Sequence, residues 1–507
     1  MKYPLLAVAG AAAVAVSGAA ALTATAFAPL SAPAGAAVPK NRHVVVFGID
    51  GVRWDKVESL DLPALDGLVA SGYASPTWLY ARPLAKTSSG PGWATVLTGT
   101  WPDKHRVADN RFQDHALAAN PTFLHLTEAY DSTFGTYAAV DWKPIGQTII
   151  RPGVDRELVL DGAAHGYASQ DDEIRDDAAA HLRDKGPHAS FVFFGEVDAA
   201  GHASGGASDA YAAALRATDA RIGAVIDAVK SRPTYDREEW LFVVTSDHGH
   251  TDAGGHGGGS KLERGSFVIA AGPGIPVSSP AVKAKNVDVA ATALDWLGVP
   301  PPAHLDGRPL TGAAPADPFD AQAPLLAARQ DESGIPPETP GWTKTFPTGW
   351  RVDDGAMGVG GVAEWRGWAL ANDEFWTAAE PGQDRENNVR ARGVFAVADP
   401  DEWADKPHSG VFTSTLVSPR IDVAGRRTLP ISFVSHYRQR GTQRATVLVS
   451  FDGGPDRRIL GFDADAPSRP VRFTISVPEG ARNAEIKFRL SDAGNDGYWT
   501  VDAPVFG

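Results

Sequence analysis

Three apolar runs in the first half of the chain each end in a carboxylate, at Asp50, Asp198 and Asp247. A single aspartate in such a place is commonly only the cap of the next helix. Three aspartates that meet at one point would repel one another unless cations neutralised their charge. The three acids together therefore indicate a metal site.

Histidines stand close to these acids in the chain. His202 comes four residues after Asp198. His248 directly follows Asp247, and His256 lies in a glycine-rich stretch. The chain has no cysteine, which excludes thiolate ligands, thiolate catalysis and a disulfide framework. Oxygen and imidazole ligands without sulfur suit zinc, with manganese and iron as the alternatives.

A serine turn lies between the first two runs, in residues 86–99 (KTSSGPGWATVLTG). Pro91 suits the first turn of a helix, Ser89 or Gly90 its cap, and Gly99 its end. A serine at a helix start lies in the positive field of the helix amides, although such a serine is often only a cap. No G-x-S-x-G elbow surrounds it, so an α/β-hydrolase triad is not indicated. A metal that lowers the pKa of the hydroxyl is the other way to activate it.

The segments that carry these groups alternate between strand and helix patterns. Residues 43–50, 190–198 and 240–248 are nearly continuous β-branched and aromatic stretches, which is typical of strands covered on both faces. Residues 208–230 have apolar side chains at helical spacing and stop before Pro233. The alternation predicts an α/β fold with a mostly parallel sheet. In such sheets ligands bind beyond the carboxyl ends of the strands.

Several motifs together resemble the alkaline phosphatase superfamily, and most closely its nucleotide pyrophosphatase/phosphodiesterase (type I phosphodiesterase) branch. They are the strand that ends in Asp50, the serine-glycine-proline turn at Ser89, T-G-x-x-P-x-x-H at 98–105, D-x-x-G-H at 198–202, S-D-H-G at 246–249, and the glycine-flanked His256. The resemblance covers about residues 43–310. It implies an alkaline-phosphatase-like fold and a phosphoester as substrate.

The resemblance also implies two zinc ions and a phosphoserine intermediate. One zinc ion would be held by Asp198, His202 and His256. The other would be held by the remaining ligands, which are Asp50, Asp247, His248 and the attacking oxygen of Ser89. Asn110 stands where the phosphodiesterase branch has an asparagine that binds a non-bridging phosphate oxygen; the alternative for Asn110 is a turn residue. His105 is expected to organise its loop, whereas His250 and Lys261 lie near the site in sequence without an assigned role.

Departures from the family pattern leave alternatives open. The phosphodiesterase branch usually has threonine before an aromatic-proline pair, whereas here Ser89 precedes Gly90 and Pro91. An alkaline phosphomonoesterase or a phosphonate hydrolase therefore stands beside the phosphodiesterase. Sulfatases have arginine where this chain has Trp93, which makes a sulfatase unfavoured. From another class, the alternative is a cell-surface or carbohydrate-binding protein with a degenerate enzyme domain.

The N-terminal residues 1–36 read as a secretory signal peptide, with one basic residue, an alanine-rich apolar run and a small-residue cleavage site. An uncleaved membrane anchor is the alternative, but the alanine bias makes the run weakly hydrophobic. No later segment is long and apolar enough to span a bilayer. We therefore expect a secreted, extracellular protein whose mature chain has no transmembrane span.

The rest of the chain divides into an enzyme domain and a second domain. Residues 40–312 are the predicted two-metal hydrolase domain, and the proline-rich residues 313–340 are a predicted linker. Residues 341–507 have short alternating runs between turn signals, which predicts an antiparallel β-sandwich such as a jelly roll. The domain resembles carbohydrate-binding and MAM-like sandwiches that carry a structural calcium ion, and this resemblance implies Asp502 as a candidate ligand.

Seven tryptophans crowd into the second domain, where tryptophan is more often core than a sugar platform. A glycan or cell-surface contact through this domain is the functional alternative.

The composition of the 507 residues fits this domain plan. The formal charge of −14 argues against a nucleic-acid-binding surface, which needs basic stripes. The hydrophobic content of 43% is that of a globular protein. The expected substrate is a small-molecule phosphoester, whose negative charge two dications would attract despite the acidic surface.

Overall fold

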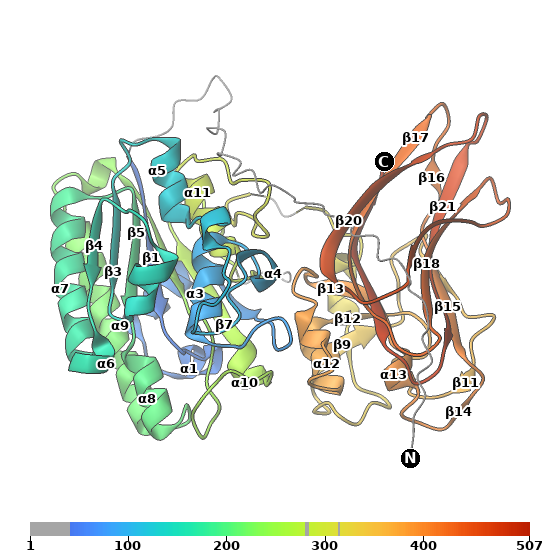
Figure 1. Cartoon of the computed structure of the whole chain (residues 1–507), viewed down its shortest axis with the longest axis horizontal. Coiled ribbons are helices and arrows are strands. Elements are labelled where there is room, and N and C mark those ends of the chain that lie inside the picture. Colours follow the sequence, from blue (N-terminus) through green and yellow to red (C-terminus); the bar gives the residue numbers. More distant parts are fainter. Residues whose placement is uncertain (1–40, 279–282, 313–314) are drawn as a thin grey trace, which may run out of the picture. The chain divides into compact units, whose positions relative to one another are not determined.

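A computed structural model describes residues 41–278, 283–312 and 315–507. The predicted signal peptide, residues 1–36, lies outside the described residues. The described residues form one unit by their contacts, with an α/β part followed by an all-β part (Figure 1). In the described part of the chain, no helix combines the length and the apolar character that crossing a bilayer requires.

The α/β part is built on a seven-stranded sheet with the strand order β2-β7-β6-β1-β5-β3-β4. Pairing is parallel from β6 through β1, β5 and β3 to β4, whereas β7 pairs antiparallel with both β6 and β2. The prediction of a mostly parallel sheet is therefore confirmed. The strands are β1 (Arg42–Ile49), β2 (Tyr73–Trp78), β3 (Thr136–Val140), β4 (Arg156–Val159), β5 (Ala189–Phe194), β6 (Glu239–Thr245) and β7 (Gly265–Ala271).

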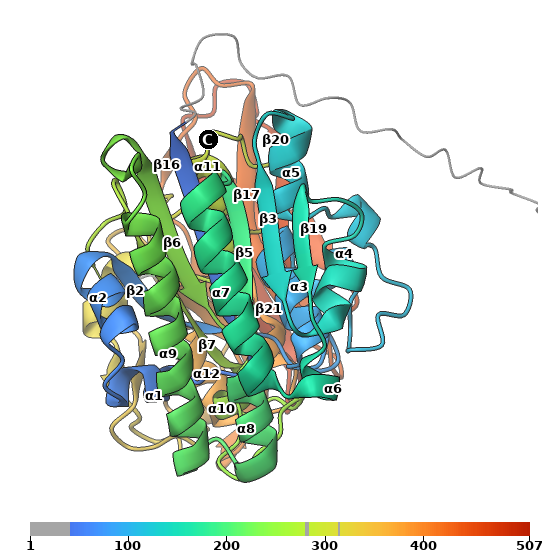
Figure 2. The same cartoon turned by 90° about the vertical axis from the view of Figure 1, so that its left-hand side faces the viewer.

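Helices cover both faces of this sheet, and Figure 2 shows α7 and α9 on one of them. Successive residues of β1 point to opposite faces: Val44 and Val46 join one core, whereas Val45 and Phe47 join the other. Burial on both faces explains why the strands read as continuous apolar runs. The first core contains α3 (Ser89–Thr98), α5 (Phe123–Tyr130) and α11 (Asp288–Trp296); the second contains α2 (Pro63–Ser71), α7 (Tyr167–Lys185) and α9 (Asp209–Lys230).

Strands β5, β1 and β6 are neighbours, so their carboxyl ends meet at one edge of the sheet. Asp50 directly follows β1, and Asp247 is the second residue after β6. Asp198 departs from the expected strand end, because β5 stops at Phe194 and Asp198 lies in the first turn of α8 (Glu196–Ser204).

A contact from another helix explains the early end of β5. The carboxylate of Asp171, on α7, accepts hydrogen bonds from the N–H groups of Gly195 (3.0 Å) and Glu196 (3.2 Å). These bonds satisfy the amides at the start of α8 and turn the chain into a helix there. As a result, Asp198 and His202 lie one helical turn apart on the same face of α8.

The all-β part contains two antiparallel sheets around one hydrophobic core. One sheet has the order β20-β17-β22-β13-β12-β9-β8, and the other has β10-β15-β21-β18-β19 with β16 paired to β21. The predicted antiparallel β-sandwich is thus confirmed. Its strands are β8 (Ala327–Ala328), β9 (Pro340–Thr343), β10 (Arg351–Asp353), β12 (Ala369–Asn372), β13 (Val394–Ala398), β15 (Phe412–Val417), β16 (Ile421–Asp422), β17 (Thr428–Arg438), β18 (Arg444–Phe451), β19 (Arg457–Phe462), β20 (Ala466–Ser476), β21 (Asn483–Ala493) and β22 (Tyr498–Phe506).

The seven tryptophans of the second domain all lie in this core, as the more common role of tryptophan suggests. They are Trp342, Trp350, Trp365, Trp368, Trp376, Trp403 and Trp499. Because they are buried, they do not form an exposed platform for sugars. The glycan contact therefore gains no support from these side chains.

Within the segment predicted as a linker, the structure has a short 3-10 helix, η4 (Asp320–Leu325), and strand β8. Strand β8 pairs with β9, and Phe319 is buried in the core of the β-sandwich. The predicted domain boundaries stay predictions. Ion pairs join the two parts: the guanidinium of Arg392 makes two hydrogen bonds of 2.7 Å to the carboxylate of Asp288, at the start of α11.

Candidate metal centre

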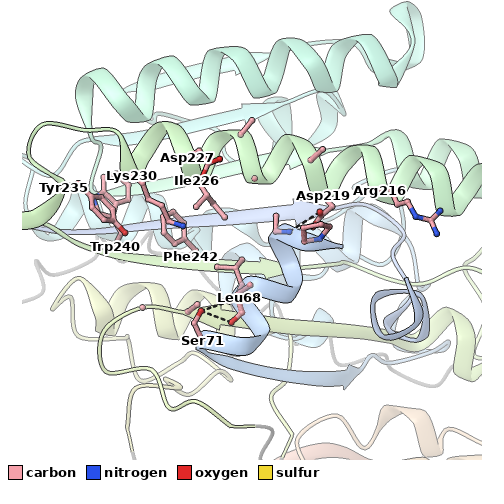
Figure 3. A pocket seen from close by; sticks show the side chains of 18 of the residues that line it. Leu68, Ser71, Arg216, Asp219, Ile226, Asp227, Lys230, Tyr235, Trp240 and Phe242 are labelled. Atoms are coloured by element: carbon pink, nitrogen blue, oxygen red, sulfur yellow. Dashed lines mark hydrogen bonds between the residues drawn. The ribbon is translucent and has the colours of Figure 1, made fainter. Parts of the chain in front are cut away.

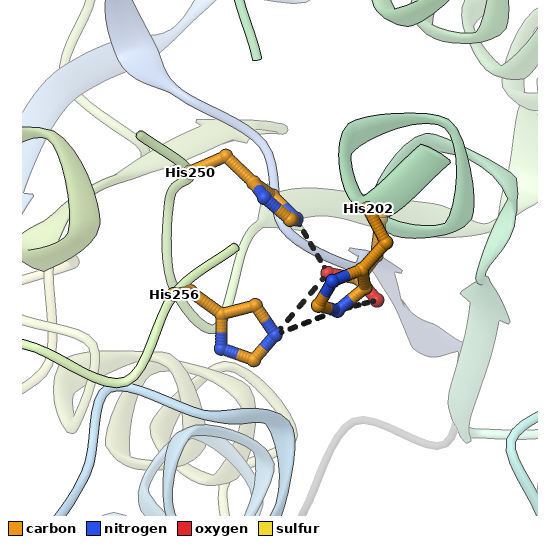
Figure 4. Close-up of side chains that lie close together, drawn as sticks. His202, His250 and His256 are labelled. Atoms are coloured by element: carbon orange, nitrogen blue, oxygen red, sulfur yellow. Dashed lines mark hydrogen bonds and ion pairs between the residues drawn. The ribbon is translucent and has the colours of Figure 1, made fainter. Parts of the chain in front are cut away.

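A first cluster of ligand atoms combines the carboxylate of Asp198 with the imidazoles of His202, His250 and His256 (Figure 4). The Nε2 atoms of His202 and His256 are 3.0 Å apart, and Oδ2 of Asp198 is 3.4 Å from Nε2 of His202. Ligands at about 2.0–2.1 Å from a tetrahedral zinc ion lie roughly 3.4 Å from one another. The separations in this cluster therefore match those around one zinc ion.

A second cluster contains Asp50, Asp247, His248 and Ser89. Nε2 of His248 lies 3.2 Å from Oδ2 of Asp247 and 3.5 Å from Oδ1 of Asp50. Oγ of Ser89 lies 3.3 Å from the same imidazole nitrogen and 3.4 Å from Oδ1 of Asp50. The structure thus brings every residue that was predicted as a metal ligand into one of two clusters. The clusters adjoin, because ligand atoms of Asp50, Asp198 and His248 lie within 4.8 Å of one another.

Each of the three carboxylates has one oxygen held by an N–H donor of the protein. The bonds are Trp93 Nε1 to Asp50 Oδ2 (3.0 Å), Gly51 N to Asp247 Oδ1 (3.1 Å) and His250 Nε2 to Asp198 Oδ1 (2.7 Å). The other oxygen of each carboxylate faces an imidazole of its cluster. Hydrogen bonds of this kind orient metal-binding carboxylates and leave one oxygen for the cation.

Glycines make the space that two of these donors occupy. A Cβ atom at Gly48, in β1, would lie 2.5 Å from Cη2 of Trp93. A Cβ atom at Gly201, in α8, would lie 2.8 Å from Nε2 of His250. Neither distance is possible between non-bonded atoms, so the rings of Trp93 and His250 fit only because both positions lack a side chain.

Burial raises the pKa of both Asp50 and Asp247 well above the usual range, and the charge of Asp198 raises it further. Burial also acts on Asp198, but the hydrogen bond from His250 and the other nearby imidazoles outweigh it and lower the pKa of Asp198 to about 2. For His248, burial lowers the pKa well below the ordinary value. His248 is therefore a neutral imidazole at neutral pH, and the buried carboxylates of Asp50 and Asp247 need positive charge nearby.

Ser89 is the first residue of helix α3, and its cap is Ser88. The expectation that Ser89 or Gly90 forms the cap is therefore wrong. The helix ends at Gly99, whose φ of 66° lies in the left-handed region that favours glycine. At the start of a buried ten-residue helix, the Ser89 oxygen lies in the positive end of the helix dipole.

Asn110 accepts a hydrogen bond from the N–H of Gly90 on its Oδ1 atom (2.7 Å). Two consequences follow for the groups near Ser89 that could donate to a phosphate oxygen. The Gly90 amide is already used, and Pro91 has no N–H to give. The amide nitrogen of Asn110 is oriented by this bond, and the residue lines a cavity of about 530 Å³ together with Ser89 and Asp198.

Aromatic side chains form another part of this cavity's wall. Trp142, from the turn after β3, and Tyr167, at the start of α7, line it with Asn110. A separate hollow of about 1070 Å³ lies between α2 and α9 (Figure 3). There the carboxylate of Asp219 accepts hydrogen bonds from the first turn of α2, and none of the predicted site residues lines it.

The remaining predicted residues lie apart from the two clusters. His105 is fully buried, with Nε2 3.1 Å from the Thr95 hydroxyl, and burial lowers its pKa to about 3. Lys261 is exposed and forms an ion pair with Glu374. Asp502 lies in β22, where its Oδ2 accepts the N–H of Arg392 at 2.8 Å.

Sequence reasoning left His250 unassigned and missed the role of Trp93 and the cavity walls. His250 comes two residues after His248, a spacing that can be noticed but that predicts no contact with Asp198. The contact between Trp93 and Asp50 joins a helix to a strand end, so it follows from packing alone. Trp142 and Tyr167 carry no motif, and only the fold brings them to the cavity.

Comparison with curated proteins finds similarity over about half of the chain. Ectonucleotide pyrophosphatase/phosphodiesterase family member 7 of Mus musculus is 24% identical over 234 residues, which cover 43% of this chain and 52% of that protein. GPI ethanolamine phosphate transferase 2 of Aspergillus fumigatus is 27% identical over 299 residues, 54% of this chain and 37% of that protein. The chain thus spans about half, or less, of the length of these relatives.

Solved structures align with the chain over a similar share. Murine ectonucleotide pyrophosphatase/phosphodiesterase 5 is 14% identical and covers 52% of this chain and 97% of its own, with a TM-score of 0.40. The phosphonate monoester hydrolase of Silicibacter pomeroyi is 18% identical and covers 54% of this chain and 78% of its own, with a TM-score of 0.41.

A family model matches the segment that carries both clusters. The model described as type I phosphodiesterase / nucleotide pyrophosphatase matches two overlapping stretches, residues 44–154 and 129–263. These stretches contain both clusters, the serine turn and Asn110. Residues 44–263 of this chain are therefore similar to the type I phosphodiesterase / nucleotide pyrophosphatase family, as the sequence motifs predicted.

Proposed function

We propose that the chain is a secreted, metal-dependent phosphoester hydrolase that acts through a phosphoserine intermediate, with phosphodiesters as its preferred substrates. The observation that carries the proposal is the position of Ser89. Its Oγ lies beside Asp50 and His248, and Ser89 lines the same cavity as Asp198, His202 and His256 of the first cluster. Similarity to the family model supports the same class of reaction.

The donor groups fit two divalent cations. Oδ2 of Asp247 is buried and has no hydrogen-bond partner, which is costly for a carboxylate oxygen unless a cation meets it. Asp198, His202 and His256 would hold one ion. Asp50, Asp247, His248 and Ser89 would hold the other. The oxygen and nitrogen donors favour zinc, with manganese and iron as alternatives. When bound, two such cations lower the pKa of a serine hydroxyl and offset the charge on the attacking and leaving oxygens.

The protein's own groups place the reacting atoms. Oγ of Ser89 forms the new bond to phosphorus while the bond to the leaving oxygen breaks. The Ser89 hydroxyl faces Oδ1 of Asp50 and Nε2 of His248 in this structure; once a cation occupied those ligand atoms, the hydroxyl would release its proton to solvent, and the leaving oxygen would take a proton from water. Water then cleaves the phosphoserine and restores the Ser89 hydroxyl. The oriented amide of Asn110 would donate to a non-bridging oxygen, and the helix dipole of α3 favours the added negative charge.

The cavity wall supports a diester over a monoester. A monoester needs only a place for its phosphate and its leaving group, whereas a diester keeps a second organic group on phosphorus throughout the first step. Trp142 and Tyr167 offer an apolar surface for such a group beside Asn110. Phosphomonoesterase or phosphonate hydrolase activity on the same site is the second candidate, because Ser89 replaces the usual threonine of the diesterase branch.

Parallel rates on bis- and mono-(p-nitrophenyl) phosphate, combined with metal analysis, test the proposal. We expect faster diester turnover, two zinc ions per chain, and at least a 1,000-fold loss of rate, about 4 kcal/mol in the barrier, in Ser89→Ala. Faster monoester turnover would reject the diester preference. Full activity of Ser89→Ala would reject the phosphoserine, and a chain without bound metal would reject the metal dependence.

Two further parts of the proposal concern the rest of the chain. Secretion through residues 1–36 predicts a mature N-terminus near residue 37, which N-terminal sequencing of the exported protein checks.

For a calcium ion in the β-sandwich, Asp502 contributes a buried Oδ1 without a hydrogen-bond partner. Among the described residues of this part, the group of three acids that meets metal-ligand spacing is instead Glu380, Asp401 and Glu402. Calcium-dependent thermal stability that Asp502→Asn removes would support the Asp502 site.

A further inference from the structure

The loop that carries His256 is rich in glycine, so its backbone can adopt many conformations. Residues 251–260 contain five glycines, Gly254, Gly255, Gly257, Gly258 and Gly259. Gly254, Gly255 and Gly257 have φ values of 98°, 85° and 108°, in the region that side chains rarely adopt. A ligand on such a loop loses much entropy when it is fixed in place. The geometry of His256 therefore depends on what holds the loop.

Thr87 makes three hydrogen bonds, one to this ligand and one to each of the two residues that follow it. Its carbonyl oxygen lies 2.8 Å from Nδ1 of His256. Its hydroxyl accepts the N–H of Gly257 at 3.0 Å and donates to the carbonyl of Gly258 at 2.7 Å. Thr87 is fully buried, so water does not compete for these bonds.

The bond to the Thr87 carbonyl also selects the form of the imidazole. A carbonyl only accepts, so Nδ1 of His256 carries the proton and Nε2 keeps its lone pair. Nε2 is the atom that lies 3.0 Å from Nε2 of His202 and 3.6 Å from Oδ1 of Asp198. The bond thus aims a metal-binding nitrogen at the first cluster.

A second anchor holds the far end of the loop. The carboxylate of Glu263 accepts the N–H of Gly258 at 2.7 Å and the N–H of Ser260 at 3.3 Å. Glu263 belongs to the chain that follows the loop, whereas Thr87 lies two residues before Ser89. Of these two anchors, only Thr87 ties the loop to the turn that carries the serine.

We propose that Thr87 is a positioning residue: its hydroxyl fastens the His256 loop to the Ser89 turn and so sets the affinity of the first cluster for its metal ion. The inference rests on the proposed function, because it takes the first cluster to be a metal site. Thr87 itself touches neither metal nor substrate. It acts on the two ligand sets by fixing the distance between the segments that carry them.

The test uses three variants of the full chain and measures zinc binding by competition with a chromophoric chelator. Thr87→Val keeps the shape of the side chain but removes the hydroxyl, and Thr87→Ser keeps the hydroxyl. The matched control is Thr98→Val, which removes a fully buried hydroxyl from α3 that bonds to Ala94 and Thr100, away from the loop. Thermal unfolding of the metal-free chains reports any general loss of stability.

We expect Thr87→Val to raise the dissociation constant of one of the two zinc ions by about 10- to 100-fold, the size of effect that outer-shell residues have on metal affinity. The dissociation constant of the other zinc ion should stay within about threefold of wild type. In Thr87→Ser and Thr98→Val, both zinc dissociation constants should stay within the same limit. Equal zinc affinities in Thr87→Val and wild type would overturn the proposal. So would a loss in Thr87→Ser or Thr98→Val as large as that in Thr87→Val.

Amide hydrogen exchange of the wild-type chain gives a second reading that needs no variant. Protection of the Gly257 amide is expected from its bond to Thr87, and fast exchange of that amide would overturn the proposal if Thr87→Val fails to fold. The two proposals fail in different ways. Intact zinc binding without hydrolysis would reject the proposed activity alone, whereas a wild-type chain that binds no metal would reject both.

Discussion

Replacing Gly201 by alanine sets two effects of opposite sign against each other. Gly201 lies inside helix α8, where alanine is favoured over glycine by about 1 kcal/mol. The new Cβ atom, however, would lie 2.8 Å from Nε2 of His250 and 2.9 Å from two of its ring carbons. That ring is fully buried and its Nε2 is bound to Asp198, so it has no free direction in which to move.

The packing effect should win. Forcing a methyl group into a filled core typically costs 1–3 kcal/mol, and an overlap with three atoms of a fixed ring belongs in the upper part of that range, about 2–3 kcal/mol. After the gain in helix propensity, we expect a net loss of about 1–2 kcal/mol in the free energy of unfolding. The displaced ring would also disturb the bond that orients Asp198, so zinc affinity should fall by about tenfold.

Gly67→Ala is the matched control, because Gly67 also lies inside a helix, α2, but no atom lies within 4 Å of its added Cβ. It should gain about 0.5–1 kcal/mol. Calorimetry of the metal-free chains should therefore separate the two variants by about 5 °C or more in the midpoint of the α/β transition. In a zinc titration, only Gly201→Ala should show a lower zinc affinity than wild type. A Gly201→Ala chain that is stabilised like Gly67→Ala, with unchanged zinc affinity, would refute the reasoning.

Three more predictions follow from single contacts. Trp93→Phe removes the donor to Oδ2 of Asp50, so zinc affinity should drop by about tenfold or more in a chelator competition, and an unchanged affinity would contradict the orienting role. Burial lowers the pKa of His43 to about 4. Below about pH 6.5 the unfolded chain binds a proton at this imidazole and the folded chain does not, so the free energy of unfolding should fall by about 2 kcal/mol from pH 7 to pH 5. Urea unfolding of His43→Gln should lack this part of the loss. Arg392→Met leaves the buried carboxylate of Asp288 without its guanidinium and should cost about 3–5 kcal/mol in thermal unfolding; a change below about 1 kcal/mol would count against a strong coupling of the two parts.

The sequence was enough to predict a mostly parallel sheet from local patterns, and the resemblance to a known family pointed to the residues of the two clusters except His250. Strands β1, β5 and β6 are apolar throughout, and parallel strands place their carboxyl ends at one edge. Their order in the sheet and the antiparallel β7 depend on contacts between distant segments. The roles of the predicted ligands remain proposals, although the structure brings their side chains together.

Features decided by distant contacts escaped prediction. The start of α8 depends on Asp171, which accepts the amides of Gly195 and Glu196 from a different helix. The cap of α3 is displaced to Ser88, since several small polar residues in a row satisfy the same local rule. In the β-sandwich, turn signals predicted short antiparallel strands, but nothing local tells which strand pairs with which.

The fit between Gly48 and Trp93 makes these two positions interdependent. Any side chain at position 48 would have to occupy the volume of the indole ring, so a substitution there is tolerated only if residue 93 becomes smaller at the same time. A library that varies both positions should therefore return paired changes and few single ones. The indole also donates a hydrogen bond to Asp50, so each such pair would gain room for a side chain at position 48 and lose this hydrogen bond. The combinations that remain active would show which of the two effects matters more.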